Sequence, residues 1–133
     1  MNKQDRANLN AISQAIFDKK GVNILALDVR GLSSMTDYFI IAEGSVNRHV
    51  KALCREIKSK AQEAGLSLFH IEGDNEGDWI VIDCGDIVIH LFTPEMREKY
   101  AFEEVWKNAS IVDVEIIVPD VSQKSMDELR RTC

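Results

Sequence analysis

The sequence predicts a single α/β domain with a mixed five-stranded sheet and helices packed on it. The chain has 133 residues and 45% hydrophobic content, which suffices for one continuous core and not for two. Apolar residues recur with helical spacing in three segments and form short β-branched or aromatic runs in five others. A helical segment separates two of these runs, and only three residues separate another two. Both parallel and antiparallel strands are therefore expected.

The first predicted element is an amphipathic helix near the N-terminus. Leu9, Ile12 and Ile16 recur at helical spacing, and Gly21 follows as a glycine that would end the helix. Residues 24–29 and residues 38–42 are rich in branched and aromatic side chains and predict two strands. Glycine, serine and aspartate between them favour a turn.

The middle of the chain predicts a β-α-β unit. Ser45 or Asn47 is placed to cap a helix that continues to Ala61. Gly65 ends this helix before a predicted strand at residues 66–71. A crossover of this length favours parallel pairing of the two strands that it joins.

Two more strands are predicted at residues 79–83 and 87–92, and the short segment between them can form only a hairpin. Thr93 and Pro94 are then placed as the N-cap and the first residue of a third helix. This helix is predicted to continue along one face past Tyr100.

The C-terminal part of the chain is predicted to lie outside the main domain. Residues 1–110 are predicted to form the domain and residues 111–133 a C-terminal extension. Residues 111–118 predict an extra strand or an extended arm, which Pro119 ends. Residues 122–131 predict a weak polar helix, and we expect this tail to be mobile because it has little to bury.

Charge is distributed unevenly along the chain. The net charge is −6, yet the segment from Ala61 to Met96 contains eight carboxylates and no lysine or arginine. The rest of the chain is therefore slightly basic. A local negative field around an aromatic side chain, Trp79, repels nucleic-acid phosphates and attracts a basic protein surface.

The sequence also restricts the compartment. No apolar run approaches the roughly 18 residues that a membrane span requires. The N-terminus has neither the apolar core of a signal peptide nor the composition of a transit peptide. The cysteines are odd in number and lack C-x-x-C spacing, which is typical of reduced thiols. We expect a cytoplasmic protein without membrane contact.

Two groups of residues only partly match known chemical sites. Residues 72–83 resemble a calcium loop, but positions 1, 5 and 12 depart from the pattern and the flanks predict strands. An acidic hairpin loop is the preferred interpretation. Cys84 and His90 could form a nucleophile and base, but no orienting group lies at a known spacing, and a buried small side chain is the preferred role for Cys84.

A glycine-serine turn, Gly44-Ser45, follows a predicted strand and precedes a helix, as in nucleotidyltransferases. Those enzymes hold a metal with a pair of carboxylates about ten residues further on, where this chain offers only Glu56. The sequence therefore predicts no enzyme, no catalytic residue, no metal site and no cofactor. A degenerate, nucleotidyltransferase-like nucleotide-binding protein is kept as the alternative function.

The strand at residues 79–83 has two different sides. Ile80 and Ile82 lie on one face, which is predicted to pack in the core. Trp79, Val81 and Asp83 lie on the other, and this mixture of a large aromatic with a carboxylate favours an interface over a core.

A series of short motifs occurs in a fixed order along residues 9–106. Its members are Ala26-Leu27-Asp28-Val29, Ser33-Ser34, Thr36-Asp37-Tyr38-Phe39-Ile40-Ile41, Gly44-Ser45 with Arg48-His49-Val50, Glu72-Gly73, Asp78-Trp79-Ile80-Val81-Ile82-Asp83, Gly85-Asp86-Ile87-Val88-Ile89-His90, and Arg97, Tyr100, Glu103 and Trp106. Together they resemble the ribosomal silencing factor family, also called RsfS or Iojap. The region after Asn108 exceeds the common core of that family.

The resemblance implies a catalytically inert relative of the nucleotidyltransferase fold. It also implies a translation inhibitor that binds the large ribosomal subunit through its protein L-fourteen and sterically blocks association with the small subunit. Little direct contact with nucleic acid is expected, and an exposed strand edge would permit a homodimer. By position, the partner-binding candidates are Asp78, Trp79, Asp83, Asp86 and His90, with Glu72 and Asp74 as outer carboxylates.

Overall fold

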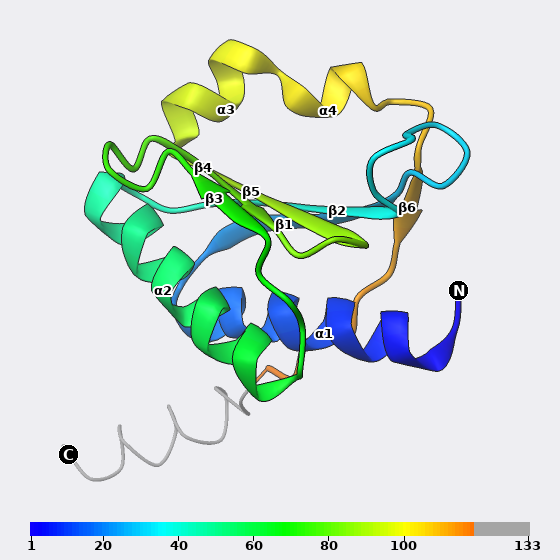
Figure 1. Ribbon diagram of the computed structural model, residues 1–133. Coiled ribbons are helices and arrows are strands. Elements are labelled where there is room, and N and C mark those ends of the chain that lie inside the picture. The colour runs from blue at the N-terminus through cyan, green and yellow to red at the C-terminus, as the bar shows by residue number, and fades with distance from the viewer. Residues whose placement is uncertain (119–133) are drawn as a thin grey trace, which may run out of the picture.

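The computed structural model describes residues 1–118. In this part of the chain, four helices pack on the two faces of one six-stranded sheet (Figure 1). None of these helices is long and apolar enough to cross a membrane. In chain order the elements are α1 (Lys3–Asp18), β1 (Val22–Asp28), β2 (Tyr38–Glu43), α2 (Asn47–Glu63), β3 (His70–Glu72), β4 (Trp79–Asp83), β5 (Ile87–Phe92), α3 (Pro94–Tyr100), α4 (Phe102–Val105) and β6 (Ser110–Val112).

The sheet has the strand order β3-β4-β5-β2-β1-β6. Only β2 and β5 pair in parallel, and every other neighbouring pair is antiparallel. The predicted α/β domain with a mixed sheet is confirmed. The predicted number of five strands was wrong, because β6 pairs with β1 as a sixth strand. This short strand crosses the boundary predicted at residue 110, and Val112 within it is buried in the core.

The β-α-β unit differs from its prediction in its pairing. The predicted strand at residues 66–71 shortens to β3, at the edge of the sheet. β2 and β3 run in the same direction, but β4 and β5 lie between them. The hairpin inserts there because β5 pairs in parallel with β2 along its whole length. The length of a crossover therefore indicates the relative direction of the two strands that it joins, but it does not determine whether they are neighbours in the sheet.

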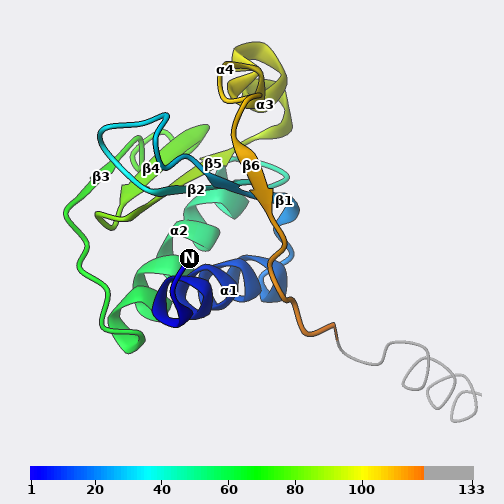
Figure 2. The same cartoon turned by 90° about the vertical axis from the view of Figure 1, so that its right-hand side faces the viewer.

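Helices α1 and α2 cover one face of the sheet (Figure 2). Mainly aliphatic side chains fill the space between them and the sheet. Ile40, Ile80, Ile82 and Ile89 are fully buried against the apolar sides of the two helices. Burial of one such side chain stabilises the fold by about 1.5–3 kcal/mol. This layer therefore supplies most of the hydrophobic stabilisation.

The opposite face of the sheet carries α3 and α4 (Figure 2). Several aromatic rings pack on this face among aliphatic side chains, and it is called the aromatic face below. Phe39 and Phe92 are buried there, whereas neither short helix contains a buried residue. The predicted continuous third helix was wrong. Ala101 adopts a left-handed conformation with φ of 46° and divides it into two short helices.

Helix ends depart from the predicted caps at two places. Lys20, and not Gly21, takes the left-handed conformation after α1, with φ of 69°. Gly21 is required for close packing instead, since a Cβ there would lie 2.3 Å from Ile16 Cγ2. At α2 the N-cap is Val46, which offers no side-chain acceptor, so neither Ser45 nor Asn47 caps the helix.

After β6 the chain runs along α1 as an extended arm. The side chains of Asn10 and Gln14 each bind its backbone, at Glu115 N (2.9 Å) and at Ile117 N (2.6 Å). The arm thus holds α1 against the sheet edge. The polar helix and mobile tail predicted at residues 122–131 lie outside the described residues.

Candidate functional site

The hairpin β4–β5 presents different side chains on its two faces, as its alternation predicted. Ile80 and Ile82 are fully buried toward α2, while Trp79, Val81 and Asp83 are only half-buried on the opposite face. Pairing places Val81 beside His90 and Asp83 beside Val88. The candidate site is thus built on the aromatic face of the sheet, where α3 and α4 cover only part of the strands.

Trp79 is held in a defined orientation. Its ring stacks on Phe92 at 5.0 Å between centroids and contacts the Tyr100 ring, also at 5.0 Å. Its indole N–H donates a hydrogen bond to His90 Nδ1 at 3.2 Å. A tryptophan fixed by two rings and one hydrogen bond is preorganised, because little side-chain entropy remains to be lost if it binds a partner.

His90 lies beneath Trp79 and not at the surface. It is only 7% exposed, and its ring packs against Phe102 at 4.2 Å. Burial lowers the pKa of His90 to about 4, so the imidazole is neutral at physiological pH. Because Nδ1 accepts the indole N–H, the ring proton is on Nε2. Of the predicted partner-binding residues, His90 is thus a buried one that holds the indole of Trp79 in place.

Asp83 and Asp86 lie at the two ends of the hairpin turn. One carboxylate oxygen of Asp83 accepts a hydrogen bond from the Gly85 N–H at 2.8 Å and fixes the turn. The Asp86 side chain is exposed, while its carbonyl oxygen accepts the N–H of Tyr38 at 3.0 Å. Asp83 therefore combines a turn-stabilising contact with a half-buried position on the candidate face.

The remaining three candidates are Glu72 on β3, which pairs with Val81 of β4, Asp74 in the loop after β3, and Asp78 immediately before β4. Asp78 accepts the Trp79 N–H at 3.0 Å through its side chain and is half-buried. Asp74 is exposed in the preceding loop. Glu72, on the edge strand β3, pairs with His70 at 2.8 Å. The seven predicted residues thus spread along the whole hairpin and do not converge on one point.

The half-buried part of this face, defined by Trp79, Val81, Asp83, Val88 and Tyr100, is called the docking surface below. The alternation of side chains between the two faces of β5 is the sequence signal that could have placed Val88 on this surface. Tyr100, at the end of α3, is 46% exposed, and its ring lies against that of Trp79.

One buried ion-pair cluster fixes α3 and α4 beside the docking surface. The guanidinium of Arg97 is 12% exposed and lies 3.3 Å from a carboxylate oxygen of Glu43 on β2. It also donates to the Asn23 carbonyl oxygen at 2.6 Å and to the Glu103 carboxylate. Arg97 and Glu103 appear in the motif series, but nothing in the sequence assigned them this anchoring role.

The possible chemical sites do not assemble. Cys84 is buried on the aliphatic side of the sheet, opposite His90, and burial raises the pKa of its thiol to about 11. The two cannot act together as nucleophile and base. Within residues 1–118, no group of three His, Cys, Asp or Glu side chains is placed to hold a metal ion.

The turn at Gly44-Ser45 has a packing explanation. A Cβ at Gly44 would lie 2.8 Å from the backbone nitrogen of Val50, so only glycine lets the chain turn this tightly from β2 into α2. The Gly44 N–H donates to the Phe92 carbonyl at 2.9 Å. Close packing therefore explains the presence of glycine at this position without a role in binding a nucleotide phosphate.

Comparison with known proteins gives a consistent result. A family model described as "Ribosomal silencing factor during starvation" matches residues 2–132. Ribosomal silencing factor RsfS of Bacillus subtilis is 38% identical over 107 residues, which cover 80% of this chain and 91% of that protein. RsfS of Halalkalibacterium halodurans is 36% identical over 104 residues, covering 78% and 89%.

Solved structures share this fold. A crystal structure of a Chromobacterium violaceum protein superposes with a TM-score of 0.73 at 32% identity and covers 90% of this chain and 98% of that one. The six-stranded arrangement is therefore shared with an experimentally determined relative.

Proposed function

Because the chain belongs to the ribosomal silencing factor (RsfS, Iojap) family, we propose that it inhibits translation by binding the large ribosomal subunit through protein L-fourteen. The family consists of ribosome regulators and the chain is not an enzyme. Bound on the intersubunit side, the domain would sterically block association with the small subunit, which requires occupancy and no chemistry. The proposed site of this action is the cytoplasm.

The observation that carries this proposal is the docking surface. A fixed tryptophan, a second exposed ring and half-buried valines supply apolar contact area of the kind that forms interface hot spots. Asp83 lies within this area, Glu72 pairs with Val81 across the neighbouring strands, and the exposed Asp86 follows at the hairpin turn. An acidic rim favours a basic ribosomal protein and disfavours direct contact with RNA phosphates.

The relation to nucleotidyltransferases is also proposed here, as a catalytically inert one. The position of Gly44-Ser45 between β2 and α2 supports it, and the lack of two closely spaced carboxylates about ten residues further on agrees with inactivity. Close packing at Gly44 already accounts for the glycine, so no specific observation favours nucleotide binding. A homodimer through the exposed edge strand β3 stays a prediction.

Sedimentation with purified large ribosomal subunits tests the proposal. The wild-type protein should co-migrate with large subunits and reduce formation of complete ribosomes in proportion to the fraction bound. Trp79→Ala should lower affinity by about 2–4 kcal/mol, the usual cost of truncating a hot spot. If the wild-type protein stays at the top of the gradient, or binds without reducing subunit joining, the proposed function is wrong.

A further inference from the structure

Three large apolar side chains are exposed at the end of the sheet where the β4–β5 hairpin turns. Leu32 is 51% exposed, Met35 88% and Phe69 69%. The first two lie in the loop between β1 and β2, and the third immediately precedes β3. Single exposed apolar residues are ordinary, but three at one end of a domain indicate a binding surface.

Gly85 brings these loops together. Its carbonyl oxygen accepts a hydrogen bond from Thr36 Oγ1 at 2.9 Å, which ties the residue next to Met35 to the hairpin turn. The Phe69 ring packs on the other side, where a Cβ at Gly85 would lie 2.9 Å from Phe69 Cε2. Gly85 also has φ of 85°, so glycine is favoured there twice over.

The loop between β1 and β2 has a fixed conformation. The N–H groups of Leu32 and Ser33 both donate to the Val29 carbonyl, at 3.0 and 2.9 Å, and the Met35 N–H donates to Ser33 Oγ at 3.1 Å. The exposure of Leu32 and Met35 is therefore built into an ordered turn. A preorganised apolar surface binds a partner with a smaller entropic cost than a mobile one.

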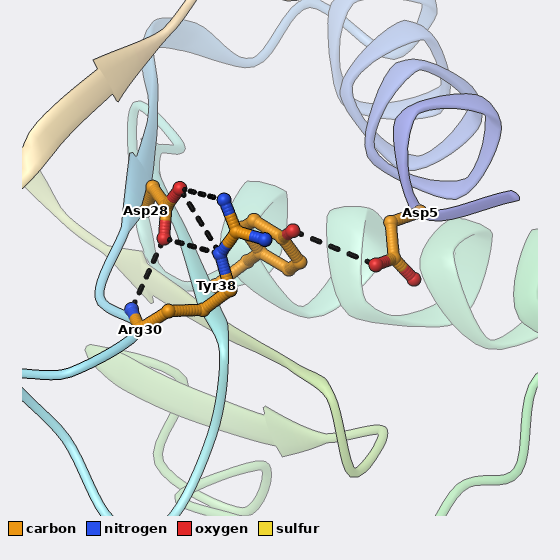
Figure 3. A network of polar contacts seen from close by, with 4 residues as sticks. All are labelled: Asp5, Asp28, Arg30 and Tyr38. Carbon is orange, nitrogen blue, oxygen red and sulfur yellow. Dashed lines mark hydrogen bonds and ion pairs between the residues drawn. The ribbon is translucent and has the colours of Figure 1, made fainter. Parts of the chain in front are cut away.

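A polar network fixes the base of the same loop (Figure 3). The Arg30 guanidinium pairs with Asp28 at 2.7 Å and lies over the Tyr38 ring, 5.4 Å from its centroid. The Tyr38 hydroxyl in turn donates to Asp5 of α1 at 3.5 Å. Hydrogen bonds from Arg30 lower the pKa of the Asp28 carboxyl. The one arginine of this loop is thus already committed to a carboxylate.

Three carboxylates lie in the loop and hairpin at this end of the sheet. Asp37, Asp83 and Asp86 come from the same loop and the same hairpin, whereas Arg30 is compensated by Asp28. An apolar surface with carboxylates around it is complementary to a protein segment that carries an apolar side chain flanked by lysine or arginine. It is a poor match for nucleic acid, whose phosphates would meet these carboxylates.

We propose that Leu32, Met35 and Phe69 form a second docking site, the tip surface, for a basic protein segment that flanks the first binding partner on the large subunit. Asp83 of the docking surface also fixes the Gly85 turn, against which Phe69 of the tip surface packs. The inference rests on the proposed function and extends it, since one partner face would then span two sides of the hairpin.

The test compares two triple variants in a binding titration with purified large ribosomal subunits. Leu32→Ser/Met35→Ser/Phe69→Ser removes the tip surface. Val22→Ser/Val46→Ser/Ile117→Ser removes three exposed apolar side chains elsewhere and is the matched control. Neither set contains a buried residue, so urea unfolding should show that both variants fold. The tip variant should bind at least tenfold more weakly, while the control should bind like the wild type.

Failure of this inference differs from failure of the proposed function. If Trp79→Ala loses affinity and the tip variant does not, the docking surface stands and the tip surface is wrong. If the wild-type protein does not bind large subunits, both the proposed function and the tip surface are wrong. Sedimentation equilibrium of the free protein tests whether a second copy of the chain binds the tip surface instead. Self-association that the tip substitutions abolish would assign the surface to a second copy and overturn the proposal.

Discussion

The two faces of the sheet use the same strands for different purposes. Along β4, Ile80 and Ile82 are fully buried under α2, whereas their neighbours Trp79, Val81 and Asp83 are half-buried on the other side. The aliphatic face is closed by two long helices, and the aromatic face is only partly closed by two short helices without a buried residue.

This difference separates stability from recognition. A face covered by long amphipathic helices tolerates little change, because close-packed cores respond to the loss of even one methylene. A partly covered face with oriented rings and carboxylates retains free contact area. Substitutions on the first face should therefore change stability, and substitutions on the second should change binding more than stability.

Ile82→Ala should give the largest effect, since it removes a fully buried side chain from the aliphatic face. The expected loss in the free energy of unfolding is about 2–5 kcal/mol, from lost burial and the cavity left behind. Urea denaturation measures it. Ile82→Val is the matched control, with an expected loss of about 0.5–1.5 kcal/mol. Equal losses for the two variants would contradict tight packing on this face.

Arg97→Ala should loosen α3 and α4 from the aromatic face. The substitution leaves the Glu43 carboxylate, which is only 12% exposed, without its guanidinium partner. Removing one partner of a buried pair typically costs about 3 kcal/mol or more. Fluorescence of the tryptophans should also change, because Tyr100 would lose its position against Trp79. Wild-type stability and an unchanged spectrum would refute the anchoring role.

The buried His90 should make stability fall at mildly acidic pH. Its pKa is lowered from 6.5 to about 4, so between these values the unfolded state binds more protons than the folded state. Stability is therefore full above pH 6.5 and decreases as the pH falls toward 4. From pH 7.5 to 5 the loss should be about 2 kcal/mol.

Urea titrations at several pH values measure this loss. In His90→Phe, which cannot titrate at this position, that part of the pH dependence should disappear. An identical pH dependence in the variant and the wild type would show that other groups are responsible.

Val46→Asp should give the smallest effect and act on the aliphatic face alone. Val46 is the N-cap of α2 but has no side-chain acceptor, and the first turn of this helix has no acidic residue. A capping carboxylate should stabilise the protein by about 1 kcal/mol. Thermal unfolding measures the gain, and large-subunit binding should not change. Val46→Ile is a control that should leave stability almost unaltered.

The local elements of the fold were predictable from the sequence. The hairpin strands at residues 79–83 and 87–92 match β4 and β5 because alternation and a three-residue turn leave one arrangement. The partner of β2 was not predictable, since strand adjacency depends on contacts far apart in the sequence. The left-handed Ala101 carries no composition signal either, because alanine ordinarily continues a helix.

The candidate site was predictable only as a set of strand faces. Alternation separated Trp79 and Asp83 from the core residues of β4. The burial of His90 depends on Phe102 from α4, and the contact between the β1–β2 loop and the hairpin depends on the hydrogen bond from Thr36 to Gly85. Both arise from packing between distant segments, which sequence periodicity does not report.

Calorimetric titration of purified protein L-fourteen tests the central claim most directly, because it asks which face of the sheet docks. Asp83→Lys reverses a charge on the docking surface, and Glu56→Lys reverses one on α2, on the opposite face. The account predicts that Asp83→Lys binds at least thirtyfold more weakly than the wild type and that Glu56→Lys binds equally well. Equal affinity for Asp83→Lys, or loss of binding only in Glu56→Lys, would contradict it.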